Sequence, residues 1–352
     1  MEWAKTRPSP RFDLAGSNVL ACSVDDLEGA RDALTFSGRN DNGYAPLQEA
    51  IAARYGVRPE QVTTAQGTSG ANFLVCAALL EPGDEVLIEM PGYDPLLGAP
   101  RLLGASVLRF ERRFEDRWAL DPARVAQAFS ERTRLIIITR PHNPTGANVD
   151  LAALREVGRL ASRHQAHVLV DEVYLDSTET PTVPAATLGD EFISTSSLTK
   201  SYGLSGLRSG WILSSEDIAE RVRRVRDVVD GSGSIVTERL SVLAFAQLDQ
   251  LIARSRALLR VNGGLVRDFL HSRPELEYVE PSGGTVVFPR IRGVDNSDRF
   301  ADRLMQNRET AIVPGRFFDA PAHFRIGFSG ATEALEGGLR ELGTALDARE
   351  WS

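Results

Sequence analysis

The sequence predicts an α/β protein in which a mostly parallel sheet is sandwiched by helices, with a smaller α+β domain beside it. Two observations predict this class. Short apolar segments without polar alternation recur between residues 62 and 213, and helical patterns separate several of them, as in parallel sheets that are covered on both faces. After about residue 240 one long helical pattern is followed by strand-like segments and further helices, which is typical of an α+β unit.

The length also favours two domains, because 352 residues exceed the usual size of one. We place the large domain at residues 36–240. Residues 1–35 form an N-terminal arm, which we assign together with residues 241–352 to the smaller domain.

The individual elements follow from the local pattern. Residues 46–55 carry apolar side chains at helical spacing and stop at Gly56, which predicts a helix. Further helices are expected at residues 73–80, 122–130, 151–164, 237–269, 297–306 and 332–346. Apolar segments predict strands at residues 62–64, 85–89, 107–110, 135–139, 167–170, 192–195, 210–213, 286–289 and 324–328. Ligands bind at the carboxyl ends of the strands in such sheets, and several polar motifs follow strands here.

Composition argues against several classes of function. The net charge of −8 disfavours a nucleic-acid partner, and we interpret the basic segment 221–226 as a solvated helix face. The first 16 residues lack the apolar core of a secretory signal, and no segment reaches the ~20 apolar residues of a membrane span. Cys22 and Cys76 form no C-x-x-C pair and suit a reducing compartment. We therefore expect a cytoplasmic protein without a membrane segment, and we predict no metal site.

The segment 194–211, STSSLTKSYGLSGLRSGW, gathers the reactive side chains. Its lysine, Lys200, carries an amine that can condense with an aldehyde to give a Schiff base, while nearby hydroxyls such as Ser197 and the guanidinium of Arg208 can grip a phosphate. Pyridoxal phosphate carries both an aldehyde and a phosphate. The alternative is a solvated loop lysine, as most lysines are.

A second phosphate-binding signal follows the strand expected at 62–64. Thr68, Ser69 and Gly70 lie where a helix begins, and free N–H groups at the positive end of a helix dipole form a phosphate seat. A plain N-cap is the alternative. The segment is no P-loop, since G-x-x-x-x-G-K-[ST] is absent.

Two further motifs supply polar side chains. Asp171 ends an apolar strand, where a buried carboxylate is costly without a partner. A pyridinium nitrogen is a suitable partner, because an anionic aspartate keeps the ring protonated and the protonated ring can accept electrons. An N-cap role is the alternative for Asp171. Asn143 and Tyr174 can both bond the phenolic oxygen of such a cofactor, although Asn-Pro alone usually signals a turn.

The motifs NPTG at 143–146, DEVY at 171–174, SLTK at 197–200 and GLR at 206–208 together resemble, in order and spacing, the class I/II aminotransferases. These are fold type I enzymes that use pyridoxal phosphate. The resemblance extends from about residue 40 to 345 and makes residues 36–240 the cofactor-binding domain.

The resemblance implies roles for the cofactor-binding residues. Lys200 forms the Schiff base and moves the proton, and Asp171 pairs with the pyridinium nitrogen. Asn143 and Tyr174 hold the phenolic oxygen. Tyr93 matches the aromatic residue that stacks on the ring, with an exposed hairpin tyrosine as the alternative. The phosphate is assigned to Thr68, Ser69, Gly70, Ser197 and Arg208.

The resemblance also implies a substrate site. Arg325 matches the arginine that binds the α-carboxylate, because a planar guanidinium can bind it through two hydrogen bonds. Asn143 and Gly16 are expected to contact the substrate as well. The N-terminal arm around residues 15–19 and the region 231–239 are expected to select the side chain. Arg39 and Arg239 suit an acidic substrate, or are solvated surface residues.

One position departs from the family pattern. Members often carry a tyrosine that reaches the phosphate of the neighbouring subunit, and Gly38 stands there in this chain. Phe36, Arg39 and Tyr44 are candidates to replace it. A homodimer is implied by the resemblance alone.

The predicted reaction is transfer of an amino group between an L-amino acid and a 2-oxo acid by ping-pong kinetics. A lyase, a decarboxylase or a cyclising synthase on the same scaffold is the alternative, because no motif reads which substrate bond is broken. A regulatory protein without turnover is disfavoured by the presence of both Lys200 and Arg325.

Overall fold

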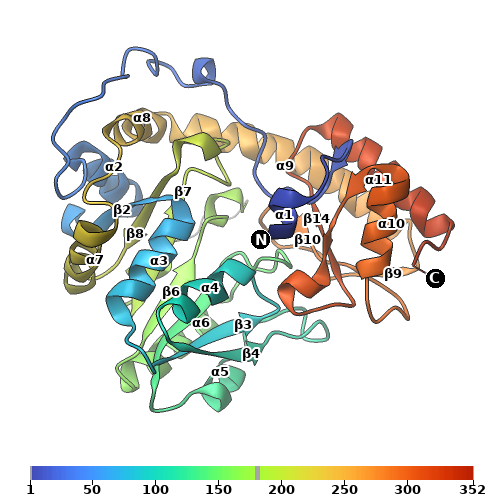
Figure 1. Cartoon of the computed structure of the whole chain (residues 1–352), viewed down its shortest axis with the longest axis horizontal. Helices are drawn as coiled ribbons and strands as arrows, with labels where there is room; N and C mark the ends of the chain where they lie inside the picture. The colour runs from blue at the N-terminus through green and yellow to red at the C-terminus, as the bar shows by residue number, and fades with distance from the viewer. Residues whose placement is uncertain (1, 179–182, 352) are drawn as a thin grey trace.

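The structure is a computed structural model and describes residues 2–178 and 183–351. It contains a large unit around a seven-stranded sheet and a smaller unit of C-terminal helices and short strands, which lie side by side (Figure 1). The N-terminal arm runs across both units before the chain enters the large one.

The central sheet confirms the predicted class. Its strand order is β2-β8-β7-β6-β5-β3-β4. Neighbours from β4 to β7 are parallel, whereas β8 is antiparallel to both β2 and β7. The strand predicted at 210–213 is therefore the exception in a mostly parallel sheet. The strands are β2 (Val62–Gln66), β3 (Glu85–Met90), β4 (Ser106–Glu111), β5 (Thr133–Thr139), β6 (His167–Asp171), β7 (Phe192–Ser197) and β8 (Ser209–Leu213).

The register of this sheet aligns polar residues at one edge. Thr139 at the end of β5 pairs with Asp171 at the end of β6, and Asp171 pairs with Thr195 in β7. Because β8 runs in the opposite direction, it begins at the same edge. Arg208, which immediately precedes β8, is thereby brought beside the ends of the parallel strands.

Alternate side chains of the strands pack into two separate cores. Leu135 and Ile137 of β5 face the core formed with α3, α4 and α7, and Ile136 and Ile138 face the core formed with α5 and α6. Since both faces are covered, these strands are continuously apolar rather than alternating. Helices of the large unit are α2 (Ala45–Tyr55), α3 (Gly67–Leu79), α4 (Asp94–Leu102), α5 (Pro122–Ala128), α6 (Leu151–Arg163), α7 (Glu216–Val229) and α8 (Ile235–Ala246).

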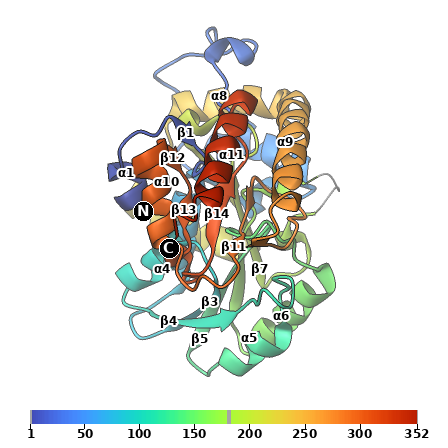
Figure 2. The same cartoon turned by 90° about the vertical axis from the view of Figure 1, so that its right-hand side faces the viewer.

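The smaller unit has its own core, to which α9, α10 and α11 contribute (Figure 2). Leu14 and Val19 of the N-terminal arm pack into this core. Its elements are α9 (Leu248–His271), α10 (Asp298–Arg308), α11 (Thr332–Asp347), β9 (Leu276–Glu277), β10 (Val286–Val287), β11 (Arg290–Ile291), β12 (Thr310–Ala311), β13 (Val313–Pro314) and β14 (Phe324–Gly327), while the arm adds α1 (Glu2–Thr6) and β1 (Phe12–Asp13). The domain boundaries at residues 36 and 240 stay a prediction.

Two local predictions were wrong. The single helix expected at 237–269 is divided at Gln247, whose side chain bonds to the carbonyl of Glu28 in the arm as well as to that of Leu243. The basic segment 221–226 is not a purely solvated face, because Arg226 is buried and donates to Thr64. No helix in the described part of the chain is long and apolar enough to cross a membrane.

Candidate active site

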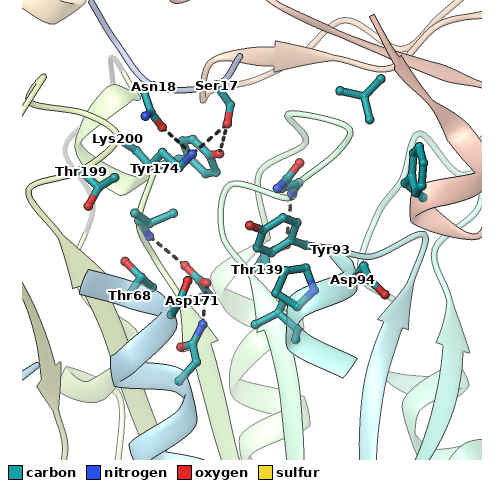
Figure 3. A pocket seen from close by; sticks show the side chains of 18 of the residues that line it. Ser17, Asn18, Thr68, Tyr93, Asp94, Thr139, Asp171, Tyr174, Thr199 and Lys200 are labelled. Carbon is teal, nitrogen blue, oxygen red and sulfur yellow. Dashed lines mark hydrogen bonds between the residues drawn. The ribbon is translucent and has the colours of Figure 1, made fainter. Parts of the chain in front are cut away.

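A cavity of about 530 Å³ lies at the carboxyl ends of the parallel strands, between the large sheet, the N-terminal arm and β14 (Figure 3). It brings together side chains from the N-terminal arm, the large unit and the smaller unit. The residues that the resemblance assigns to the cofactor, to the α-carboxylate or to direct substrate contact all line it except Gly70: Gly16, Thr68, Ser69, Tyr93, Asn143, Asp171, Tyr174, Ser197, Lys200, Arg208 and Arg325. Arg39 and the region 231–239 with Arg239, the other candidates for binding the substrate side chain, do not line it.

One end of the cavity is built to receive an anion. The N-terminus of α3 points into it, and Thr68 Oγ1 donates to Ser197 Oγ at 2.9 Å. Arg208 has a positive φ of 51°, and its guanidinium lies against Gly67, where an added Cβ would be 2.5 Å from Nη2. Thr199 Oγ1 is buried in the cavity wall without a hydrogen-bond partner among the described residues.

Gly70 is displaced from this end. It is the fourth residue of α3, and a helix leaves free only the N–H groups of its N-cap and first three residues. The free N–H groups therefore belong to Gln66, Gly67, Thr68 and Ser69, so the phosphate assignment of Gly70 has no support in the geometry.

The wall of the cavity also holds a buried carboxylate. Asp171 accepts hydrogen bonds from Asn72 Nδ2 at 2.9 Å and from the N–H of Val173 at 3.2 Å. Thr195 fixes the amide of Asn72 by donating to its Oδ1 at 2.6 Å. Burial raises the pKa of Asp171, although these hydrogen bonds and the nearby Lys200 oppose the rise. The carboxylate thus lies in a position where a cation would stabilise it.

Lys200 lines the same cavity, above Thr68 and Asp171 in Figure 3. Its Nζ donates to Ser17 Oγ at 3.0 Å and to Asn18 Oδ1 at 2.6 Å. Tyr174 also donates to Ser17 Oγ, at 3.0 Å. Lys200, in the loop after β7, and Tyr174, which follows β6, therefore share one hydrogen-bond acceptor, Ser17 of the N-terminal arm (Figure 3).

Arg325 of β14 reaches the cavity from the smaller unit. Its Nη1 donates to Asn143 Oδ1 and its Nη2 to the carbonyl of Ala15, both at 2.8 Å. The guanidinium lies 5.1 Å from the ring centroid of Phe318, and its buried Nε has no partner among the described residues. Burial lowers the pKa of Arg325. The group suits recognition of a carboxylate at this side of the cavity.

A buried ion pair supports the cavity from below. Glu89 accepts hydrogen bonds from the N–H and Oγ1 of Thr139, both at 2.6 Å, and from Arg112 Nη1 at 3.0 Å. Thr139 Oγ1 in turn accepts from the N–H of Asn143 at 3.1 Å. Burial raises the pKa of Glu89 and lowers that of Arg112. The pair fixes the loop that carries Asn143.

Sequence reasoning missed several of these residues. Asn72 lies in α3, two residues after the predicted phosphate-binding segment 68–70. Its contact with Asp171 joins α3 to β6 and cannot be recognised from the local sequence. Ser17 and Asn18 lie in the arm that was expected to select the substrate side chain, yet they contact Lys200. The cavity is also lined by Trp3, Arg7 and Phe317, which belong to no motif recognised in the sequence.

The residues of the cavity fit pyridoxal phosphate. The anion site at the start of α3 suits the phosphate, since the Thr199 hydroxyl there has no partner within the described part of the chain. The buried Asp171 carboxylate suits the cationic ring nitrogen. Tyr93 and Lys200 line the same cavity. The donor set therefore matches the three chemically distinct parts of this cofactor.

Comparison with known proteins identifies the family. The chain matches the model of aminotransferase class I and II over residues 23–342 and belongs to that family. Its members use pyridoxal phosphate, which confirms the cofactor prediction and makes the chain a member of a family of pyridoxal-phosphate-dependent transferases.

Several relatives match almost the whole chain, including a synthase and a transaminase. Capreomycidine synthase of Streptomyces vinaceus is 34% identical, and the match covers 99% of this chain and 94% of that protein. An arginine–pyruvate transaminase of Pseudomonas aeruginosa is 28% identical over 95% of this chain and 91% of its own length.

Many solved structures share the fold, among them the following two. The PLP-dependent aminotransferase of Streptococcus suis has a TM-score of 0.93 at 28% identity, covering 99% of this chain and 96% of its own. The PLP-dependent cyclase OrfR has a TM-score of 0.88 at 27% identity, with the same coverage of 99% and 96%.

Proposed function

We propose that this protein transfers an amino group between an L-amino acid and a 2-oxo acid by a ping-pong mechanism. One observation carries the proposal: the amine of Lys200, the carboxylate of Asp171 and the guanidinium of Arg325 line a single cavity. An amine, an acid that stabilises a cationic ring and a group that binds a carboxylate are what this reaction requires.

The composition makes Lys200 the natural candidate for the reactive amine. The chain contains two lysines among its 40 basic residues of the Lys and Arg types, and the other, Lys5, lies exposed in α1. Lys200 lies in the cavity wall beside the predicted phosphate seat. No other lysine amine is available to the proposed chemistry.

The cofactor would be held at three points. Ser197, Arg208 and the start of α3 with Thr68 and Ser69 would bind the phosphate. Asp171 would hold the ring nitrogen in its protonated form, and Asn143 and Tyr174 would bind the phenolic oxygen. Tyr93 would cover one face of the ring.

Bound pyridoxal phosphate supplies an aldehyde that bonds to amines and a cationic ring that accepts an electron pair from the substrate α-carbon. Arg325 would orient the substrate by binding its α-carboxylate. The carboxylate would either replace the Asn143 oxygen as acceptor for Nη1, or bind to Nε, which has no partner among the described residues. Gly16 and Asn143 would line the same substrate position. Lys200 would take the proton from the α-carbon, and the low polarity of the buried site would strengthen each of these charged contacts.

A cyclising synthase is the second candidate. The relative at 34% identity is a synthase, and OrfR is a cyclase with a TM-score of 0.88. The same lysine, carboxylate and arginine would serve either reaction, since both begin with loss of the α-proton. The choice would depend on which substrate bond is broken next.

Product analysis separates the two candidates. The loaded enzyme is mixed with single L-amino acids, including L-arginine because of the transaminase relative, and 2-oxo acid and ammonia are measured in a single turnover. One equivalent of 2-oxo acid per site without ammonia supports amino transfer. Product without 2-oxo acid, with loss of water or ammonia, supports the second candidate and contradicts the first.

The attachment of the cofactor has a test of its own. Borohydride reduction of the loaded enzyme, followed by peptide mass analysis, should place the added mass on Lys200 and not on Lys5. An added mass on neither lysine, together with activity retained in Lys200→Ala, would contradict the proposed function as a whole.

A homodimer, typical of the family, is part of the proposal. The arm segment before Gly38 exposes apolar side chains, among them Phe36 at 94% and Leu34 at 52%, which suits coverage by a second copy. Light scattering of the purified protein tests this point. The cytoplasmic location, inferred from the cysteine usage, stays a prediction.

A further inference from the structure

The N-terminal arm holds the amine of Lys200. Nζ donates to Ser17 Oγ at 3.0 Å and to Asn18 Oδ1 at 2.6 Å. Ser17 Oγ also accepts the hydroxyl hydrogen of Tyr174 at 3.0 Å. Figure 3 shows the two arm residues above the lysine, converging on its nitrogen. The amine is thus bound by two neutral oxygen acceptors that are adjacent in sequence.

The arm is fixed in this position by backbone contacts on both sides. The N–H of Val19 donates to the carbonyl of Lys200 at 3.0 Å, which ties the arm to the lysine segment. On the other side, the N–H of Gly327 donates to the carbonyl of Leu14 at 2.7 Å. This approach is so close that a Cβ on Gly327 would lie 1.7 Å from the carbonyl oxygen of Gly16.

The carbonyls of the two arm residues are held as well. Thr285 Oγ1 donates to the carbonyl of Ser17 at 3.0 Å, and Ser329 Oγ donates to that of Asn18 at 2.8 Å. Both donors belong to the smaller unit, whereas Lys200 belongs to the large one. The two acceptors are therefore held by backbone and hydroxyl contacts to both units, and their position does not depend on the lysine side chain.

We propose that Ser17 and Asn18 are positioning residues that receive the amine of Lys200 whenever it is not bonded to the cofactor. The inference rests on the proposed role of Lys200 as the group that moves the α-proton. After the substrate has displaced it, the amine must stay beside the substrate, take up a proton and return it. Acceptor oxygens stabilise the ammonium that exists between these two proton transfers.

The acceptor pair also limits where the lysine can go. A free lysine side chain has four rotatable bonds, and two hydrogen bonds to a fixed arm remove most of this freedom. Since Tyr174 donates to the same Ser17 oxygen, the amine stays next to a residue proposed to bind the cofactor. Holding the proton-moving group in one place raises the rate of the step that it performs.

The first test uses the protein without cofactor. Reductive methylation with formaldehyde and cyanoborohydride labels amines, and Lys5, the only other lysine of the chain, serves as an internal reference. Loss of a hydrogen bond to the ammonium should speed labelling of Lys200 about tenfold in Ser17→Ala and in Asn18→Ala. Ser23→Ala is the matched control, because Ser23 is exposed on the same arm. Ser17→Thr keeps the hydroxyl and should label like the wild type.

The second test uses the loaded enzyme. We expect kcat to fall about tenfold in Ser17→Ala and in Asn18→Ala, with KM changed less than threefold, and Ser17→Thr to recover most of the loss. Unchanged labelling, or faster labelling with an unchanged kcat, overturns the inference while leaving the proposed function intact. Failure of the proposed function itself would appear separately, as activity that persists in Lys200→Ala.

Discussion

Replacing Asp171 by asparagine should stabilise the protein without cofactor and nearly abolish its activity. The side chain is 6% exposed and lies in a row of aligned strand ends. Asparagine keeps the shape, and its oxygen can still accept from the N–H of Val173. Its amide hydrogens would meet those of Asn72, so the Asn72 amide must turn over, which Thr195 permits because a hydroxyl can accept as well as donate.

The gain in stability follows from the burial of the charge. A carboxylate that is buried for the sake of function lowers the free energy of unfolding, and a neutral side chain of the same shape restores it. We expect a gain of roughly 1 kcal/mol, which corresponds to about 2 °C in Tm for a chain of this size. Burial raises the pKa of Asp171, so its contribution to stability is present in full below the ordinary aspartate pKa and is lost as the pH rises through the raised value. The variant should therefore match the wild type in acid and exceed it toward neutral pH.

The loss of activity follows from the same carboxylate. Without it, a cationic ring nitrogen has no anionic partner, and removal of one such preorganised group typically costs a factor of about 10²–10³ in kcat. Thermal unfolding of the cofactor-free protein, from below the ordinary aspartate pKa of about 3.9 up to neutral pH, measures the first effect. Single-turnover kinetics of the loaded enzyme measure the second. A variant that is less stable at neutral pH, or that keeps its rate within tenfold, would refute the reasoning.

Three further predictions concern other parts of the cavity. Arg325→Lys should raise KM about tenfold or more with little effect on Tm, because lysine cannot bind a carboxylate through two parallel hydrogen bonds; steady-state kinetics check this. Gly67→Ala should weaken cofactor binding about tenfold, since the added Cβ would lie 2.5 Å from a guanidinium nitrogen of Arg208. Gly70→Ala is the control, because its Cβ would meet only the Cβ of Gln66 at 3.5 Å. Fluorescence titration measures the cofactor affinity of both variants, and equal affinities would contradict the geometry of the anion site. Arg112→Met should cost about 3–5 kcal/mol in denaturant unfolding by leaving Glu89 buried and unpaired, and adding Glu89→Gln should recover part of that loss.

Much of the fold was determined by the sequence alone. Strands such as β5 and β6 are continuously apolar because both of their faces are covered, and this pattern needs no knowledge of the partners. The reactive segment around Lys200, the start of α3 and the aspartate at the end of β6 were also readable, because each places a characteristic residue at the end of a predicted strand or the start of a helix. Local pattern therefore located the site along the chain.

Contacts between distant segments were decided by the tertiary structure. The break between α8 and α9 lies at Gln247, whose side chain bonds to the carbonyl of Glu28 in the distant arm. Arg226 is buried where it can donate a hydrogen bond to Thr64 of β2. The contact of Asn72 with Asp171 depends on how α3 packs against the sheet, and those of Ser17 and Asn18 with Lys200 depend on the path of the arm between the two units. A hydrogen bond between residues more than 90 positions apart leaves no periodicity in either segment, so only the packed chain reveals which side chain serves the reactive lysine.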